Sequence, residues 1–227
     1  MSETLTKYLP DSKTWLRATV ASIPFVGGAL DHLLFDKADA LRLRNVEAAV
    51  RALSDRLSEV SEASVDKDWF ASEEALAAMR LLSEKVGFEA DKQKIHDMGR
   101  FVAACGLHPQ STDSRKLAVL EHLSRLSPTQ TRLLKVFAGI PARTRKEASS
   151  GKSILQTITA VWTEDVKAAL QAAPPFWEGS LNLSLELEVL ESLNTIRRVG
   201  VIGLGDPAYA LTALGRHAVG FVAAANL

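Results

Sequence analysis

The chain contains a single cysteine, Cys105, among 227 residues, and this scarcity excludes a disulfide framework within one chain. Cys105 lies in the apolar run 101–105, where a thiol behaves as a small hydrophobic side chain. Aromatic residues make up only 6% of the chain, and 27 Lys and Arg are balanced by 27 Asp and Glu. This balance lacks the basic excess of typical nucleic-acid binders. We therefore expect a protein of a reducing compartment, and the cytoplasm is the expected location.

Glycine-rich nucleotide motifs are absent too. Gly200, Gly203 and Gly205 have the spacing G-x-x-G-x-G, whereas a dinucleotide fold needs G-x-G-x-x-G between a strand and a helix. The run 149–153 ends like a phosphate-binding loop, but Lys146 stands where that loop needs its first glycine. Neither stretch therefore predicts a nucleotide site.

Arrangements for catalysis or metal binding are also missing. No two histidines are four residues apart, and neighbours such as His96 and Asp97 do not face each other on a helix. No Gly-x-Ser-x-Gly elbow is present, and Cys105 has no evident base. We therefore predict a protein that is not an enzyme, with no catalytic residue, cofactor, metal or small-molecule substrate.

What the sequence does contain, as far as about residue 107, is helical periodicity. Apolar residues recur three and four positions apart over about 29–61, 72–86 and 91–106, and each pattern predicts an amphipathic helix. Charged residues between them, such as Arg56 and Glu59, are expected on solvated faces. The residues expected to point inward are Val46, Ala49, Val50, Leu53, Leu57, Val60, Leu76, Met79, Leu82, Val86, Ile95, Met98, Phe101 and Val102.

A change of pattern follows a polar stretch. Pro, Ser, Thr and Asp cluster in "GLHPQSTDSRK" and predict a linker at 109–116. Beyond it, helices are expected over 129–138, 153–161, 163–173 and 183–199, with a polar loop over 140–153. The predicted fold is mainly α, with a helical bundle at 1–108 and a winged-helix-like α+β lobe at 117–227.

The winged-helix prediction rests on the last segment. Residues 199–203 can form a strand, 205–208 a turn and 209–212 a returning strand, and a final helix is expected from Ala213. Three helices, a hairpin and a last helix are the element order of a winged-helix domain.

The third helix of such a domain usually enters the major groove of DNA. Here it is expected to expose Glu186, Glu188 and Glu191, which phosphates would repel. The basic residues that could contact a nucleic acid or another partner are Arg143, Arg145, Lys146, Lys152, Arg197 and Arg198.

One apolar stretch, "ATVASIPFVGGALDHLLF" at 18–35, is close to the length of a membrane span. Pro24 and the glycine pair at 27–28 would break such a helix in its middle, which favours a buried corner between two helices. Membrane insertion of this stretch is the alternative.

Several stretches carry a resemblance: "IPFVGGAL", "DWFASEEALAAMRLLSEK", "LSRLSPTQTRLLKVF" and the ending "YALTALGRHAV". In this order they resemble a group of uncharacterised bacterial proteins with a helical N-terminal region and a winged-helix-like C-terminal region. The arrangement is also similar to the abortive-infection alpha family of phage-defence proteins. The resemblance implies a bacterial cytoplasmic protein linked to defence, and it implies no catalytic residue.

We therefore expect a non-enzymatic regulatory or adaptor protein that binds a protein partner, or a second copy of itself through its first lobe. Two alternatives stay open. The first is a transcriptional regulator that binds duplex DNA. The second is an abortive-infection effector that acts on membranes through residues 18–35.

Overall fold

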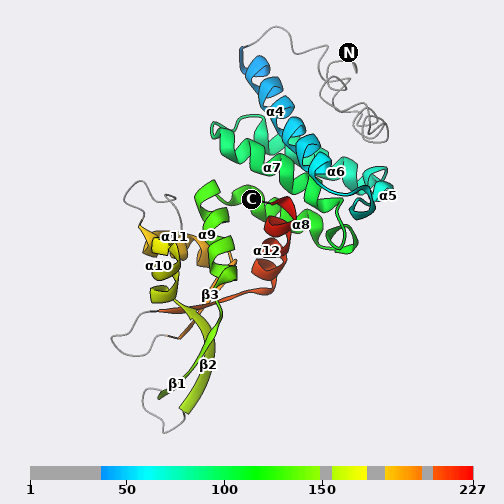
Figure 1. Ribbon diagram of the computed structural model, residues 1–227. Coiled ribbons are helices and arrows are strands. Elements are labelled where there is room, and N and C mark those ends of the chain that lie inside the picture. The colour runs from blue at the N-terminus through cyan, green and yellow to red at the C-terminus, as the bar shows by residue number, and fades with distance from the viewer. Residues whose placement is uncertain (1–36, 149–154, 173–181, 201–206, 227) are drawn as a thin grey trace. The chain divides into compact units, whose positions relative to one another are not determined.

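The structure is a computed structural model that describes residues 37–148, 155–172, 182–200 and 207–226. The chain divides into two compact units, the first made of residues 1–128 and 220–227 and the second of residues 129–219. In the described residues the first unit is helical, and the second combines helices with a sheet (Figure 1). The predicted fold class, mainly α with a small α+β lobe, is confirmed.

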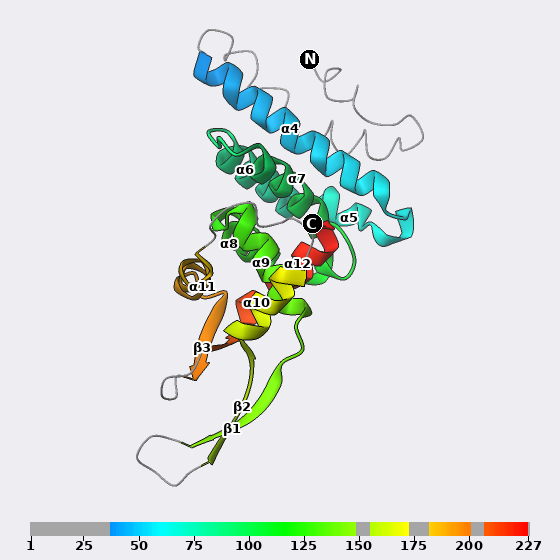
Figure 2. The same cartoon turned by 60° about the vertical axis from the view of Figure 1, so that its left-hand side comes forward.

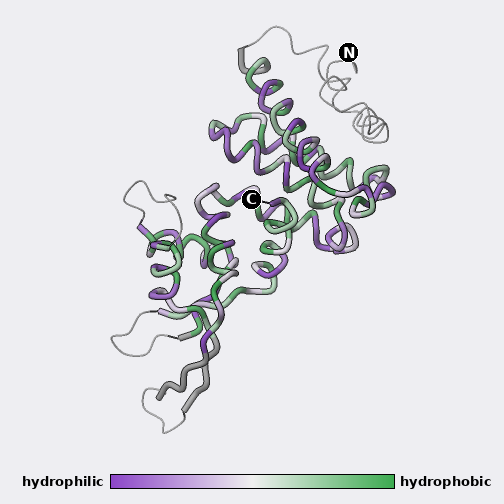
Figure 3. The backbone as a smooth tube through the Cα atoms, viewed as in Figure 1, coloured by the Kyte–Doolittle hydropathy of each residue, from purple (hydrophilic) through white to green (hydrophobic). Residues whose placement is uncertain are grey.

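The first unit is built from helices, which are α4 (Lys37–Glu59), η1 (Glu62–Ser64), α5 (Lys67–Phe70), α6 (Glu73–Val86), α7 (Lys92–Cys105), η2 (Gln110–Thr112) and α8 (Lys116–Arg125). Of these, α5, α6 and α7 begin at a capping side chain. Ser72 accepts a hydrogen bond from the backbone N–H of Ala75 at the start of α6, and Asp91 caps α7 in the same way. Polar and apolar residues alternate along α4, as expected of an amphipathic helix (Figure 3).

The predicted apolar stripes form the core of this unit. Of the residues expected to point inward, Val46, Val60 and Leu76 are half-buried and the others are buried. The helices α4 and α7 lie side by side (Figures 1 and 2). The two backbones approach closely at Gly99, where an added Cβ would lie 2.0 Å from the carbonyl oxygen of Ala49. Glycine at this position therefore allows the two backbones to touch.

The boundary between the units lies at Pro128, and the linker expected at 109–116 is part of the first unit. This stretch contains η2, and Ser111 and Lys116 are buried. The Lys116 ammonium lies 2.8 Å from a carboxylate oxygen of Glu74, and Gln110 donates a hydrogen bond to the carbonyl of Gly220. The polar residues on which the linker prediction rested therefore form contacts within the first unit.

The second unit begins with α9 (Pro128–Gly139) and continues through β1 (Arg143–Ala148), β2 (Leu155–Trp162), α10 (Thr163–Ala172) and α11 (Leu183–Ser192). It ends with β3 (Ile196–Gly200), β4 (Ala208–Leu211) and the start of α12 (Ala213–Ala225). The four strands form an antiparallel sheet in the order β1-β2-β4-β3. The order β2-β4-β3 is that of a winged-helix sheet, to which β1 adds an outer strand.

The hairpin of β1 and β2 corrects two expectations, since 140–153 was predicted as a loop and 153–161 as a helix. It projects beyond the rest of the second unit (Figure 2). Thr157, Ile158, Thr159 and Val161 are β-branched, and Trp162 is aromatic, so this segment fits a pleated strand better than a helix.

A further correction concerns the predicted helix 183–199. The helix α11 ends at Ser192, and Asn194 follows in the left-handed conformation with a φ of 57°. Asparagine tolerates this conformation and commonly ends helices. The chain then enters β3, which pairs with β4 as the predicted hairpin, although the strand begins earlier than expected. Residues 201–206, including Gly203 and Gly205, lie outside the described residues.

Candidate functional site

The six basic residues predicted as contacts come from two strands and from a stretch outside the described residues. Arg143, Arg145 and Lys146 lie on β1, and Lys152 lies outside the described residues. Arg197 and Arg198 lie on β3, at the opposite edge of the sheet. Three strand spacings separate the two edges, which is about 14 Å. Of the six, only Arg143, Arg197 and Arg198 have side chains that the structure describes, and Arg143 lies at the opposite edge of the sheet from the other two.

Arg143 is engaged inside the unit. Its guanidinium forms an ion pair with Oδ1 of Asp165 on α10, although the Arg143 side chain is 57% exposed. The Asp165 side chain is almost fully buried, and its Oδ2 has no hydrogen-bond partner within the described part of the chain. A buried carboxylate needs a compensating cation, so this arginine serves the stability of the lobe.

Arg198 is also held by its neighbours. Its guanidinium lies 5.8 Å from the centre of the Tyr209 ring and donates a 3.4 Å hydrogen bond to the Tyr209 hydroxyl. Its backbone N–H donates to Oε1 of Glu191, and its Nε lies 3.8 Å from the other oxygen. Arg197 is exposed, and no described residue forms an ion pair with it. Of the two arginines on β3, only Arg197 could therefore bind an external anion without giving up a contact with a described residue.

The third helix of the lobe, α11, presents a different surface. Leu185 is 52% exposed and is one of three large apolar side chains that the described residues expose, with Leu41 and Phe88. Glu188 and Ser192 are exposed beside it, and Val189 is half-buried. The helix carries three glutamates and no basic residue. We call Leu185, Glu188, Val189 and Ser192 the α11 face.

Two of the α11 glutamates already have partners. Glu186 accepts a 2.9 Å hydrogen bond from Gln130 on α9, and Glu191 interacts with Arg198. Glu188 is exposed and forms no hydrogen bond or ion pair with any described residue, although its charge acts on the Arg198 guanidinium. The expected exposure of acidic residues on this helix thus holds most fully for Glu188.

A charged cluster that the sequence reading missed lies in the first unit. Arg100 donates two hydrogen bonds to the Glu59 carboxylate, at 3.0 and 2.6 Å, and a third, at 2.7 Å, to the carbonyl of Ala225. Arg56 donates to Glu59 and to the carbonyl of Ala224. The two guanidiniums therefore cap the last turn of α12, where carbonyls lack helical partners.

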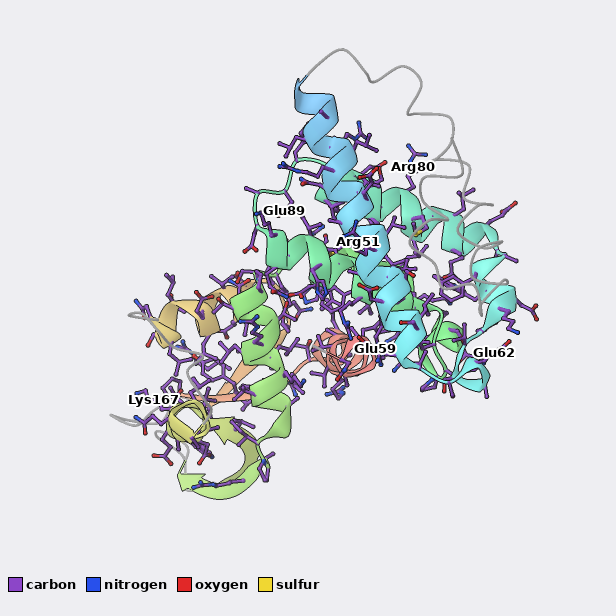
Figure 4. The ribbon with its side chains drawn as sticks, turned by 45° about the horizontal axis from the view of Figure 1, so that its top comes forward. Arg51, Glu59, Glu62, Arg80, Glu89 and Lys167 are labelled. Atoms are coloured by element: carbon purple, nitrogen blue, oxygen red, sulfur yellow. The ribbon has the colours of Figure 1, made fainter. Side chains whose placement is uncertain are left out.

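This cluster corrects the expected solvated face of α4. The Arg56 side chain is 12% exposed, and Figure 4 shows Glu59 at the end of α4. The hydrogen bond from Arg100 lowers the pKa of Glu59 to about 2, with Arg56 contributing in the same direction. The i,i+3 spacing of Arg56 and Glu59 permits their ion pair, but no spacing rule could predict that Arg100 and the end of α12 join it, because these lie far away in the sequence.

The neighbours His96 and Asp97 were expected not to face each other, and the structure corrects this expectation. His96 Nδ1 lies 3.7 Å from Asp97 Oδ1, which accepts a 2.7 Å hydrogen bond from Gln93. Burial raises the pKa of the Cys105 thiol, so it stays protonated and unreactive. Within the described ranges, no three His, Cys, Asp or Glu residues are grouped to hold a metal ion.

The apolar stretch at 18–35 lies outside the described residues. Among those that are described, no helix combines the length and the apolar character that crossing a membrane requires. No protein-family model, no curated protein and no solved structure matches this chain, so its function is argued from its own residues.

Proposed function

We propose that this chain is a non-enzymatic adaptor that binds another protein through the α11 face of its winged-helix-like unit. The observation that carries the proposal is the pairing of an exposed apolar side chain, Leu185, with an exposed carboxylate, Glu188, to which no described residue is hydrogen-bonded. Fold alone does not decide between DNA and protein binding, but the chemistry of the third helix favours protein.

The charge of α11 is the argument against DNA. Phosphate contacts supply most of the affinity of duplex binding, and they require Lys or Arg. This helix has neither, Arg198 is engaged by Tyr209 and Glu191, and Arg143 by Asp165. An apolar patch with a polar rim is instead typical of protein interfaces, and Leu185 with the half-buried Val189 forms such a patch on α11.

A photo-crosslinking amino acid at position 185 of the full chain, expressed in its native cells, tests the proposal. We expect a discrete protein adduct, because Leu185 would lie at the centre of the contact. Lys167, exposed on α10 of the same unit (Figure 4), is the matched control position and should give little adduct. Equal adducts at both positions, or none at position 185, would overturn the proposal.

Titration of the full chain with a random-sequence duplex tests the DNA alternative. We expect no micromolar binding at 150 mM salt, a condition under which phosphate-driven contacts are already weakened. Micromolar binding that weakens steeply with salt, and that Arg197→Ala/Arg198→Ala abolishes, would establish the DNA-binding regulator instead. Flotation with liposomes tests the membrane alternative in the same preparation.

The biological setting is part of the proposal. The resemblance stated above supports a bacterial adaptor that acts in the cytoplasm, within phage defence. If this is right, Leu185→Asp should weaken protection against phage in a strain that depends on the chain. The same strain with Lys167→Ala should keep its protection.

A further inference from the structure

We propose that the partner presents a basic amphipathic helix to the α11 face. This inference rests on the proposed function, because it names the chemistry of the partner that the adaptor would bind. The partner helix would place apolar side chains on Leu185 and Val189, and a Lys or Arg beside Glu188.

The spacing of the α11 face supports a helical partner. Leu185, Glu188, Val189 and Ser192 follow one another at i, i+3, i+4 and i+7, so they share one side of the helix over two turns. A straight stripe of this kind packs well against the ridge of a second helix. The N–H of Leu185 is already bonded to the capping Asn182 side chain, so the first turn is fixed.

The size of the residues along the stripe also fits a side-by-side contact. Leu185 projects most, with half of its surface exposed, and Val189 one turn further is half-buried. Ser192 ends the stripe with a small side chain whose hydroxyl is bonded to the carbonyl of Val189. A partner helix could therefore approach most closely at the Ser192 end and enclose Leu185 at the other.

The charges on α11 indicate which charge the surface of the partner should carry. The glutamates at 186 and 191 are already bonded to Gln130 and Arg198, so Glu188 is the carboxylate left for a partner. Burying Glu188 under an apolar or acidic partner would cost free energy, because no donor within the described residues is hydrogen-bonded to its carboxylate. A Lys or Arg opposite Glu188 would remove that cost and would exclude acidic partners.

A pair of designed peptides tests this inference. The probe is a fluorescent 18-residue helix with Leu at i, i+3, i+4 and i+7 positions and Lys elsewhere, and its matched control carries Glu in place of every Lys. We expect the full chain to bind the Lys peptide at least about tenfold more tightly than the Glu peptide, as measured by fluorescence anisotropy.

Variants of the chain locate the contact. Glu188→Lys and Leu185→Asp should each weaken binding of the Lys peptide by about tenfold, since each removes a central contact. Asp55→Lys makes the same change of charge at an exposed position of α4, and it should change affinity by less than about twofold. Circular dichroism of each variant checks that it remains folded.

The outcomes separate the two proposals. No binding of the Lys peptide, equal binding of both peptides, or equal effects of Glu188→Lys and Asp55→Lys would overturn the basic helix as partner. If position 185 still forms a protein adduct in cells, the adaptor function stands and only the chemistry of its partner is wrong. If position 185 forms none, the adaptor function itself fails.

Discussion

Glu59 illustrates how one side chain can join three parts of a unit. Its carboxylate binds guanidiniums from α4 and α7, and these also bind the carbonyls of Ala224 and Ala225. The Arg100 side chain is only 8% exposed, so an unpaired guanidinium here would be costly. Glu59 itself remains partly exposed, and solvent therefore screens its contribution.

The shifted pKa of Glu59 predicts how its contribution depends on pH. A folded pKa of about 2, below the ordinary 4.5, means that the contribution is complete above pH 4.5. It declines as the pH falls and is lost near pH 2. We expect the native chain to exceed Glu59→Gln in free energy of unfolding by about 1 kcal/mol at neutral pH, after allowance for solvent screening.

Urea unfolding of both proteins at a series of pH values gives this difference directly. Other carboxylates titrate equally in the two proteins, so their effects cancel. A difference that stayed constant from pH 7 to pH 2 would contradict the assigned role of Glu59.

At the scale of elements, the contact of α4 with α7 depends on Gly99. We expect Gly99→Ala to destabilise the chain by about 2 kcal/mol, although alanine favours helix by up to about 1 kcal/mol. The added Cβ would collide with the Ala49 carbonyl, and the backbones would have to separate. Gly139→Ala is the matched control, since nothing lies within 4 Å of a Cβ there.

Thermal or urea unfolding of the two variants compares them. Gly139→Ala should be neutral or slightly stabilising, because it reduces the freedom of the unfolded chain. If Gly99→Ala were equally harmless, the stability of the first unit would not depend on the close approach of α4 and α7 at this position.

The elements α4, β2 and α11 show how much of the fold and of the candidate site the sequence could predict. The stripe from Ala49 to Leu57 was predictable, because burial of one helix face imposes a regular spacing. The strand β2 was not, because its short apolar run fits either a helix or a strand, and pairing with β1 and β4 decided between them. The α11 face was half predictable: the glutamates were visible, but the exposure of Leu185 depends on which side of α11 packs inward.

At the scale of the whole molecule, the first unit is built from two separate parts of the sequence. Residues 220–227 belong to it, and Phe221, Val222 and Ala225 are buried there. The helix α12 starts in the second unit and ends in the first. The predicted division into consecutive lobes therefore missed the return of the chain.

Removal of residues 220–227 should destabilise the first unit by about 4 kcal/mol or more, because buried apolar surface and the partners of Arg56 and Arg100 are lost together. Phe221→Ala is a milder variant and should cost about 3 kcal/mol. Ala223→Ser, at an exposed position of the same helix, should have little effect.

Hydrogen exchange followed by mass spectrometry can show which of the two units loses stability in Phe221→Ala. We expect the amides of α4 and α7 to lose protection in Phe221→Ala, while those of β3 and β4 change less. Unchanged protection in α4 and α7 would show that the end of α12 does not support the first unit.

The return of the chain to its first unit has a consequence for biosynthesis. A ribosome releases residues in order, and domains generally fold as their sequences emerge. Residues 129–219 are continuous, so the second unit can finish folding while the first still awaits Phe221, Val222 and Ala225. The helices made earliest would thus reach their final stability only after residues 220–225 have been synthesised, later than the second unit.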